Sequence, residues 1–180
     1  GIEEVSQEDI NKEIAKNVAR VKILPLILKN DDGSALTDTQ KADLKKKAEE
    51  YIERVKNGED FNEIINKYYE EKYDNSTLLP ELNPKMNNST EDDKYENETI
   101  VYKGHQYIDP DAVTKMIELD KYNEPTFIDS TTYYYVVVKL DIAEREDVLE
   151  QYRKSALIKI KNDEFEKLAA SWGENYKVEK

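Results

Sequence analysis

Apolar residues recur at helical spacing near the start of the chain. Ser6 is of a residue type favoured at helix N-caps. Ile10, Ile14 and Val18 follow it at four-residue intervals, which places their side chains on one helical face. The pattern predicts an N-terminal flanking helix within residues 1–19.

A pair of helices is predicted between residues 38 and 69. Thr37 and Gln40 form a capping box, in which each side chain bonds the backbone N–H of the other residue. Gly58 is expected just beyond the end of the first helix, and Asp60 begins the second. The core-facing residues are expected to be Ala48, Tyr51, Ile52, Val55, Phe61, Ile64, Ile65 and Tyr68.

Short stretches rich in β-branched and aromatic residues predict four strands. They lie at about 20–29, 99–102, 125–128 and 133–141. Pro25 interrupts the first stretch. Because proline has no backbone N–H, it indicates an edge position or a bulge there.

A short helix and a long one complete the expected elements. Asp109 followed by Pro110 is a start signal for a helix whose Val113, Met116 and Ile117 face the core. From about Glu144 a long helix is predicted, with a break near Asn162 and an end at Gly173. Tyr176 and Val178 would then add a short terminal strand.

Residues 71–98 differ from their surroundings. They are rich in asparagine and acidic residues, contain two prolines and lack periodic apolar positions. We therefore expect a loop insert, the most mobile or least regular part of the chain. Its Asn-x-Ser/Thr triplets begin at Asn75, Asn87, Asn88 and Asn97. Such triplets arise by chance in this composition, so glycosylation is the weaker interpretation.

The predicted order is helix, strand, two helices, loop, strand, helix, two strands and a long helix. This order indicates the α+β class: a four-stranded antiparallel sheet covered by helices on one side, with N- and C-terminal flanking helices. The expected organisation is a flanking helix at 1–19, a domain at 20–143 that contains the insert, and a helical extension at 144–180.

Charge and composition exclude several classes of partner and site. The 180 residues include 27 basic and 40 acidic ones, giving a net charge of −13 that repels nucleic acid and anionic membranes. The chain contains no cysteine, which removes disulfides, thiol nucleophiles and cysteine zinc sites. The longest aliphatic run, 23–28, contains Pro25 and is too short to span a bilayer.

No cofactor or metal is expected. The glycines are isolated, so no phosphate-binding glycine motif exists. A calcium loop centred on Gly33 would place Leu28 and Thr39 where carboxylates are required. His105 is the only histidine, and the sequence places no base or nucleophile beside it, so a surface role is favoured over a catalytic one.

Three stretches resemble the parvulin-type peptidyl-prolyl isomerases. Residues 21–28, VKILPLIL, resemble the first strand of the family, V-R-A-x-H-I-L. Residues 55–61, VKNGEDF, resemble the K-x-G-E-D-F junction between its first two helices. Residues 134–140, YYVVVKL, resemble the closing strand, G-Y-H-I-I-K-V. Together with the element order, the resemblance covers about residues 20–145.

The resemblance implies a proline-binding site that lacks its polar part. Pro25 and Val136 stand where the family has two histidines, and the family's acid or cysteine falls near Asn97. Neither a proline nor a valine side chain can hydrogen-bond to a twisted amide, so the implied isomerase activity is low or absent. Catalytic residues are therefore unassigned. The implied substrate-binding residues are Pro25, Tyr102, Gln106, Met116, Ile117, Phe127, Tyr135 and Val136.

The flanking helices resemble those of secreted foldases and periplasmic chaperones that contain a parvulin module. The resemblance implies an extracytoplasmic foldase module, secreted or lipid-anchored, that binds unfolded or proline-containing polypeptide. Because the chain begins at Gly1 rather than Met, we expect a processed or recombinant piece whose signal or membrane anchor lies upstream. Two alternatives stay open: an active peptidyl-prolyl cis-trans isomerase with a substituted pocket, and an unrelated α/β surface interaction domain.

Overall fold

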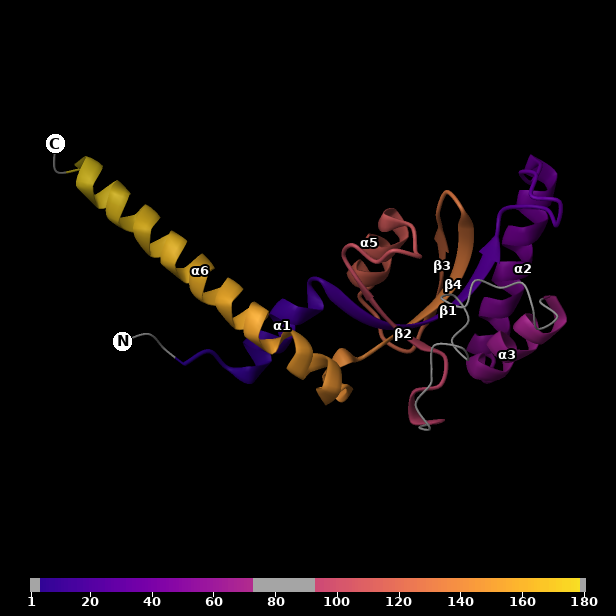
Figure 1. Ribbon diagram of the computed structural model, residues 1–180, viewed down its shortest axis with the longest axis horizontal. Coiled ribbons are helices and arrows are strands. Elements are labelled where there is room, and N and C mark those ends of the chain that lie inside the picture. The colour runs from indigo at the N-terminus through magenta and orange to yellow at the C-terminus, as the bar shows by residue number, and fades with distance from the viewer. Residues whose placement is uncertain (1–3, 73–92, 179–180) are drawn as a thin grey trace. The chain divides into compact units, whose positions relative to one another are not determined.

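The computed structural model describes residues 4–72 and 93–178, and it divides into two units (Figure 1). The larger unit is Val18–Asp141, and the helical unit combines Gly1–Asn17 with Ile142–Lys180. The strands are β1 (Val18–Ile27), β2 (Glu98–Tyr102), β3 (Pro125–Asp129) and β4 (Tyr133–Leu140). The helices are α1 (Gln7–Ala15), α2 (Asp38–Lys56), α3 (Phe61–Lys72), α5 (Pro110–Glu118) and α6 (Glu146–Val178), with short 3₁₀ turns at Asp93–Tyr95 and Ile142–Glu144.

The sheet has the strand order β2-β1-β4-β3, and every pairing is antiparallel. The predicted α+β class, with four antiparallel strands and helices at both ends of the chain, is confirmed. Among the described helices, none is long and apolar enough to cross a membrane.

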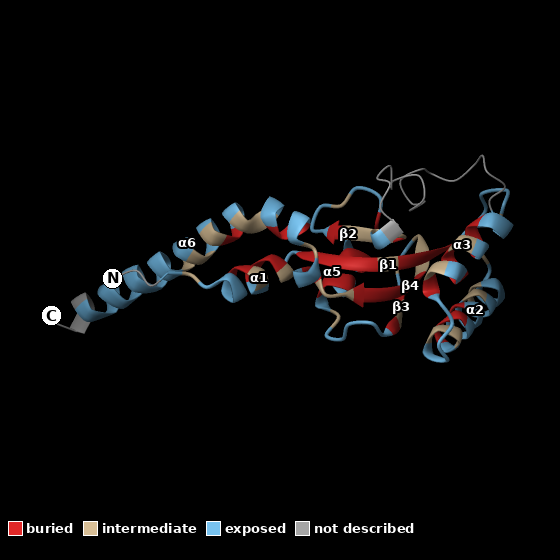
Figure 2. Ribbon diagram, turned by 90° about the horizontal axis from the view of Figure 1, so that it is seen from below, coloured by how far each residue is buried: buried red, intermediate tan, exposed pale blue. Residues whose placement is uncertain are grey.

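Helices cover both faces of the sheet, and the prediction that they cover one face is wrong (Figures 1 and 2). On one face, Leu24 and Val136 are buried beneath α2 and α3. On the other, Ile23 and Val137 are buried beneath α5. Apolar residues occupy successive positions of β1 and β4, so each of these strands has apolar side chains on both faces of the sheet. Burying both faces requires helices on both sides.

The predicted caps of the helix pair are confirmed. The Thr37 N–H donates to Gln40 Oε1 over 2.9 Å, and the Gln40 N–H donates to Thr37 Oγ1 over 3.2 Å. Gly58 follows α2 with a φ of 95°, a left-handed conformation that glycine adopts without a Cβ penalty.

Asp109 occupies the predicted N-cap position of α5, but its side chain does not cap the helix. Its carboxylate instead accepts hydrogen bonds from Ser130 Oγ at 2.5 Å and from the Thr132 N–H at 3.1 Å. Asp109 therefore joins the start of α5 to the turn between β3 and β4.

Pro25 is accommodated because β1 has a described neighbour on only one side at that point. β2 pairs with Val18–Lys22 and extends no further along β1. The Leu28 N–H donates to the carbonyl of Thr132, just before β4, at 3.0 Å. Along a strand, the N–H and carbonyl of successive residues point alternately to one neighbouring strand and to the other. The nitrogen of Pro25 consequently faces away from β4. The strand as a whole is central, while the segment around Pro25 has the edge position that its proline predicts.

The boundaries of the terminal helices correct the sequence prediction. α1 ends at Ala15, and Val18 begins β1 instead of continuing the helix. α6 runs unbroken through Asn162 and Gly173, so the predicted break, end and terminal strand are wrong. A helical glycine costs only about 1 kcal/mol relative to alanine, which the surrounding helix-forming residues offset.

The predicted insert falls mainly on residues 73–92, which lie outside the described residues. Of its four Asn-x-Ser/Thr triplets, the one at Asn97 lies among the described residues. Asn97 is buried, and its Nδ2 donates to Asn66 Oδ1 over 3.2 Å. An amide in that position is inaccessible to glycosylation in the folded domain.

A buried ion pair joins the strands of the larger unit. Arg20 of β1 donates from Nε and Nη2 to the two carboxylate oxygens of Glu98 on β2, at 2.8 and 2.5 Å. The two side chains are 8% and 4% exposed. Arg20 Nη1 also donates to the Asp141 carbonyl, just beyond β4, at 3.0 Å. One guanidinium therefore connects β1 with β2 and with the backbone just beyond β4.

We predict that Glu98→Gln lowers the free energy of unfolding by about 3 kcal/mol, because the buried Arg20 charge loses its carboxylate. Glu59→Gln is the matched control, since Glu59 forms the same two-bond pair with Arg54 at the surface, where the side chains are 38% and 41% exposed. It should change stability by less than about 1 kcal/mol. Urea unfolding followed by circular dichroism measures both, and equal losses would contradict the prediction.

Candidate functional site

The residues expected to bind substrate lie in three different places. Within the sheet register, Pro25 is paired with Tyr135, and Tyr135 packs with Met116 and Ile117 on the α5 face. Val136 and Phe127 lie on the α2–α3 face. Tyr102 and Gln106 are exposed, at the end of β2 and just after it.

The register separates Pro25 and Val136, the two residues that the sequence resemblance places at one site. Pro25 lies opposite Tyr135, whereas Val136 lies opposite Leu24. Because successive side chains of a strand point to opposite faces, Pro25 and Val136 belong to different faces of the sheet. Pro25 and Tyr135 are the residues that the structure brings together.

The α5 face at Tyr135 is a packed core. Tyr135 and Met116 are fully buried there, and Ile117 is nearly so. Burial raises the pKa of Tyr135 strongly, and the nearby charge of Asp109 adds to the shift, so the hydroxyl stays protonated. These side chains cannot contact a ligand without rearrangement of the core.

An exposed group of aromatic side chains follows β2, and we call Tyr102, His105 and Tyr107 the aromatic patch. The His105 ring centroid lies 5.3 Å from that of Tyr102 and 6.2 Å from that of Tyr107. The tyrosines are 40% and 46% exposed. The His105 N–H donates to the Tyr102 carbonyl at 3.0 Å, across a turn in which Gly104 has a φ of 95°. This turn holds the three rings together at the surface.

His105 is adapted to the neutral form within this patch. Its Nδ1 accepts a hydrogen bond from the Tyr107 N–H at 3.3 Å. Partial burial lowers the pKa of His105 below its ordinary value of 6.5. The patch is therefore uncharged and aromatic near pH 7. The sequence prediction missed Tyr107, although two tyrosines on either side of a glycine turn were a visible signal.

The outer edge of β3 is partly obstructed. The Ser130 N–H donates to the Tyr133 carbonyl at 3.0 Å, and alternation from that bond turns the backbones of Pro125, Phe127 and Asp129 outward. Pro125 has no N–H to offer, and the Asp129 carbonyl already accepts a hydrogen bond from Lys115 Nζ at 2.9 Å. Among the described residues, Phe127 is left with an outward N–H and carbonyl on this edge.

The outer edge of β2 is open. The same alternation places the N–H and carbonyl of Ile100 on the side away from β1. Within the described part of the chain, β2 is an edge strand and no backbone group pairs with Ile100 on that side. This edge leads directly to the aromatic patch at Tyr102. Each edge thus keeps one residue with an outward N–H and carbonyl, Phe127 on β3 and Ile100 on β2, and the β2 edge is the one that ends at the aromatic patch.

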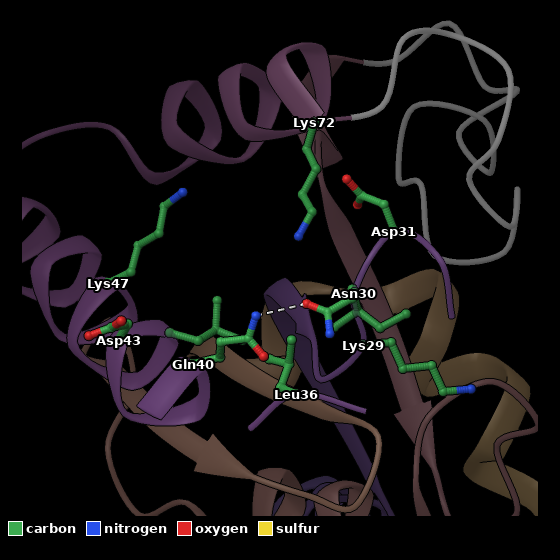
Figure 3. Close-up of a pocket in the computed structure, with 10 residues that line it drawn as sticks. Lys29, Asn30, Asp31, Leu36, Gln40, Asp43, Lys47 and Lys72 are labelled. Carbon is green, nitrogen blue, oxygen red and sulfur yellow. Dashed lines mark hydrogen bonds between the residues drawn. The ribbon is translucent and has the colours of Figure 1, made fainter. Parts of the chain in front are cut away.

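A surface pocket of about 340 Å³ lies elsewhere in the larger unit, and we call it the lysine pocket (Figure 3). It is lined by Ile27, Lys29, Asn30, Asp31, Leu36, Gln40, Asp43, Leu44, Lys47 and Lys72. Its walls come from the end of β1 with the loop after it, from the first half of α2 and from the last residue of α3. The pocket has no sequence signal, because three distant segments contribute to it.

Metal chemistry has no support in the described residues, which contain no group of three or more histidine, cysteine or acidic side chains that could hold an ion. No family model, curated protein or solved structure matches the chain. The function therefore has to follow from the geometry, above all from the open β2 edge and the aromatic patch.

The single histidine permits a direct test of the patch. We predict that the ring protons of His105 titrate with a midpoint below 6.5 in proton NMR, because partial burial disfavours the imidazolium. Since the folded pKa is lowered, protonation opposes folding, and stability should fall as the pH drops below about 6.5. His105→Gln should reduce that loss. A midpoint at or above 6.5 would contradict the prediction.

Proposed function

We propose that the larger unit binds extended segments of polypeptide along the outer edge of β2, as a foldase or chaperone module with little or no isomerase activity. One observation carries this proposal: the open edge at Ile100 ends at the exposed aromatic patch. The edge supplies backbone hydrogen-bonding groups, and the patch supplies apolar surface beside them.

Strand addition suits a ligand without a fixed sequence. An extended segment beside β2 would pair with the outward N–H and carbonyl of Ile100, and these bonds do not depend on side chains. Aromatic rings accept the flat faces of proline and other apolar side chains, so Tyr102 and Tyr107 would favour proline-containing segments. The net charge of −13 further favours basic or neutral segments over acidic ones.

The resemblance to parvulins supports the same function. It implies a strand, two helices, a strand, a helix and two strands, and the described elements β1, α2, α3, β2, α5, β3 and β4 follow that order. By this resemblance we propose an extracytoplasmic protein, secreted or lipid-anchored, in which any membrane anchor lies outside the chain. Its partner would be unfolded or proline-containing polypeptide.

Catalysis is not part of the proposal because the groups that it would need are missing. An isomerase must stabilise a twisted amide with hydrogen-bonding groups around it, against a barrier of about 18–20 kcal/mol. Pro25 offers no such group, and the Tyr135 hydroxyl beside it is buried. Val136 lies under α2 and α3 on the other face.

We predict that the protein binds a fluorescent, unstructured peptide that contains proline, and that Tyr107→Ser weakens the affinity roughly fivefold, the effect of one lost aromatic contact. Tyr122→Ser is the matched control, because Tyr122 is 44% exposed, close to the 46% of Tyr107, but lies outside the aromatic patch. Fluorescence anisotropy measures both affinities. Equal weakening by the two variants would show that binding does not use the patch.

Ile100→Pro tests the edge itself. It removes the outward N–H of Ile100 and leaves the β1–β2 bonds intact, so peptide affinity should fall at least fivefold while the free energy of unfolding changes little. If this variant does not fold, Tyr102→Ser and Tyr107→Ser decide the question. Unchanged affinity in a folded Ile100→Pro protein would refute strand addition.

A proline-containing tetrapeptide separates binding from catalysis. We predict an isomerisation rate within about tenfold of the uncatalysed rate, which takes tens to hundreds of seconds. Val136→His should not restore activity, because the new imidazole would be buried under α2 and α3. Robust turnover that His105→Ala abolishes would instead establish the alternative, an active isomerase with a substituted pocket. Binding without any preference for unfolded segments would favour an unrelated interaction domain.

A further inference from the structure

We propose that the lysine pocket binds a carboxylate that bears an apolar group, such as an aliphatic acid or the free C-terminus of a polypeptide with an apolar last residue. The proposal is independent of the β2 edge, because none of the residues that line the pocket belongs to β2 or the aromatic patch.

The lysine pocket is lined by three lysines without an ion pair. None of Lys29, Lys47 and Lys72 forms an ion pair within 4 Å with another described residue. Other described lysines share this state, among them Lys45 and Lys46 on α2, so the pocket is distinguished by the convergence of Lys47 and Lys72 on one aromatic ring.

Two of the ammonium groups face a common space. Lys47 Nζ and Lys72 Nζ lie 5.7 and 5.8 Å from the centre of the Tyr68 ring. Figure 3 shows them approaching the pocket from different helices, with Lys29 extending away from both. Partial burial lowers the pKa of Lys72; the charge of Asp31 opposes this shift, and the like charge of Lys47 adds a smaller contribution to it. An anion placed between the two ammonium groups would remove this repulsion.

The remaining walls suit the apolar part of the ligand. Ile27, Leu36 and Leu44 contribute aliphatic surface. Gln40 Nε2 donates to Asn30 Oδ1 at 3.1 Å, the dashed bond in Figure 3, while Gln40 also caps α2 through its other side-chain atom. Because the cap fixes Gln40, this wall is preformed, which lowers the entropic cost of binding.

The charge balance favours one carboxylate over a more highly charged anion. Asp31 and Asp43 also line the pocket, so Lys47 and Lys72 are balanced by two carboxylates, and the single excess charge of the lining belongs to Lys29. Asp31 attracts Lys72 without forming an ion pair within 4 Å. A phosphate dianion would be repelled by both carboxylates twice as strongly as a monocarboxylate, which favours the lower charge. A volume of about 340 Å³ lies at the lower end of the range for small-molecule sites.

Titration calorimetry on the full chain tests the proposal with two probes, hexanoate and an unstructured peptide ending in a free leucine carboxylate. Hexylammonium and the same peptide with a C-terminal amide are the paired controls. We expect either carboxylate to bind and both controls to bind at least tenfold more weakly. Binding of hexanoate alone identifies a small acid as the source, and binding of the free-acid peptide identifies a polypeptide terminus. Binding of neither up to about 10 mM overturns the proposal.

Matched variants locate the site. Lys47→Gln and Lys72→Gln should each weaken carboxylate binding about tenfold, the effect of one lost charge-assisted bond. Lys46→Gln makes the same charge change on α2 outside the pocket and should leave affinity within about twofold. Asp31→Asn should strengthen binding, because it removes a competing carboxylate. Equal effects of Lys46→Gln and Lys47→Gln, or weaker binding by Asp31→Asn, would overturn the proposal.

Discussion

The pairing of β1 with β4 is the constraint on which the rest of the larger unit depends. Its register runs from Arg20 opposite Leu140 to Ile27 opposite Tyr133. The register decides which side chains meet α5 and which meet α2 and α3. It also directs Lys139 toward α5, where its ammonium donates to the carbonyls of Ile117 and Leu119 at 2.6 and 2.9 Å. The same ladder that builds the sheet therefore satisfies the C-terminal end of a helix on its face.

Local signals explain how much of the fold could be predicted. The Thr37–Gln40 capping box and the glycine after α2 act over a few residues, so the sequence showed them directly. The face assignment of β4 could not be obtained in this way. Residues 133–138 are tyrosine and valine throughout, and both faces are covered, so no alternation marks which side each residue takes. For that reason the sequence interpretation placed Pro25 and Val136 in one site, whereas in the sheet Pro25 lies opposite Tyr135.

The candidate sites were harder to predict than the fold because they are made by juxtaposition. The aromatic patch needs the turn at Gly104 to bring Tyr102 toward Tyr107, and two of its three members come from outside any strand or helix. The lysine pocket needs three segments, whose contributions look like ordinary surface charges when taken separately. By contrast, the absence of cysteine and the single histidine follow from composition, and they exclude disulfides, thiol nucleophiles and cysteine zinc sites.

An open strand edge is also a template for self-association, since any extended chain can pair with it, including another copy of the same protein. Beyond the end of β2, the side of β1 in line with β2 is unpaired within the described residues, and it is a second place where a strand could add. Pro25 lies in that stretch with its nitrogen facing away from β4, so a strand that paired there would lack one donor. The proline thus weakens strand addition to β1, while the outer edge of β2, one strand further out, keeps its own groups.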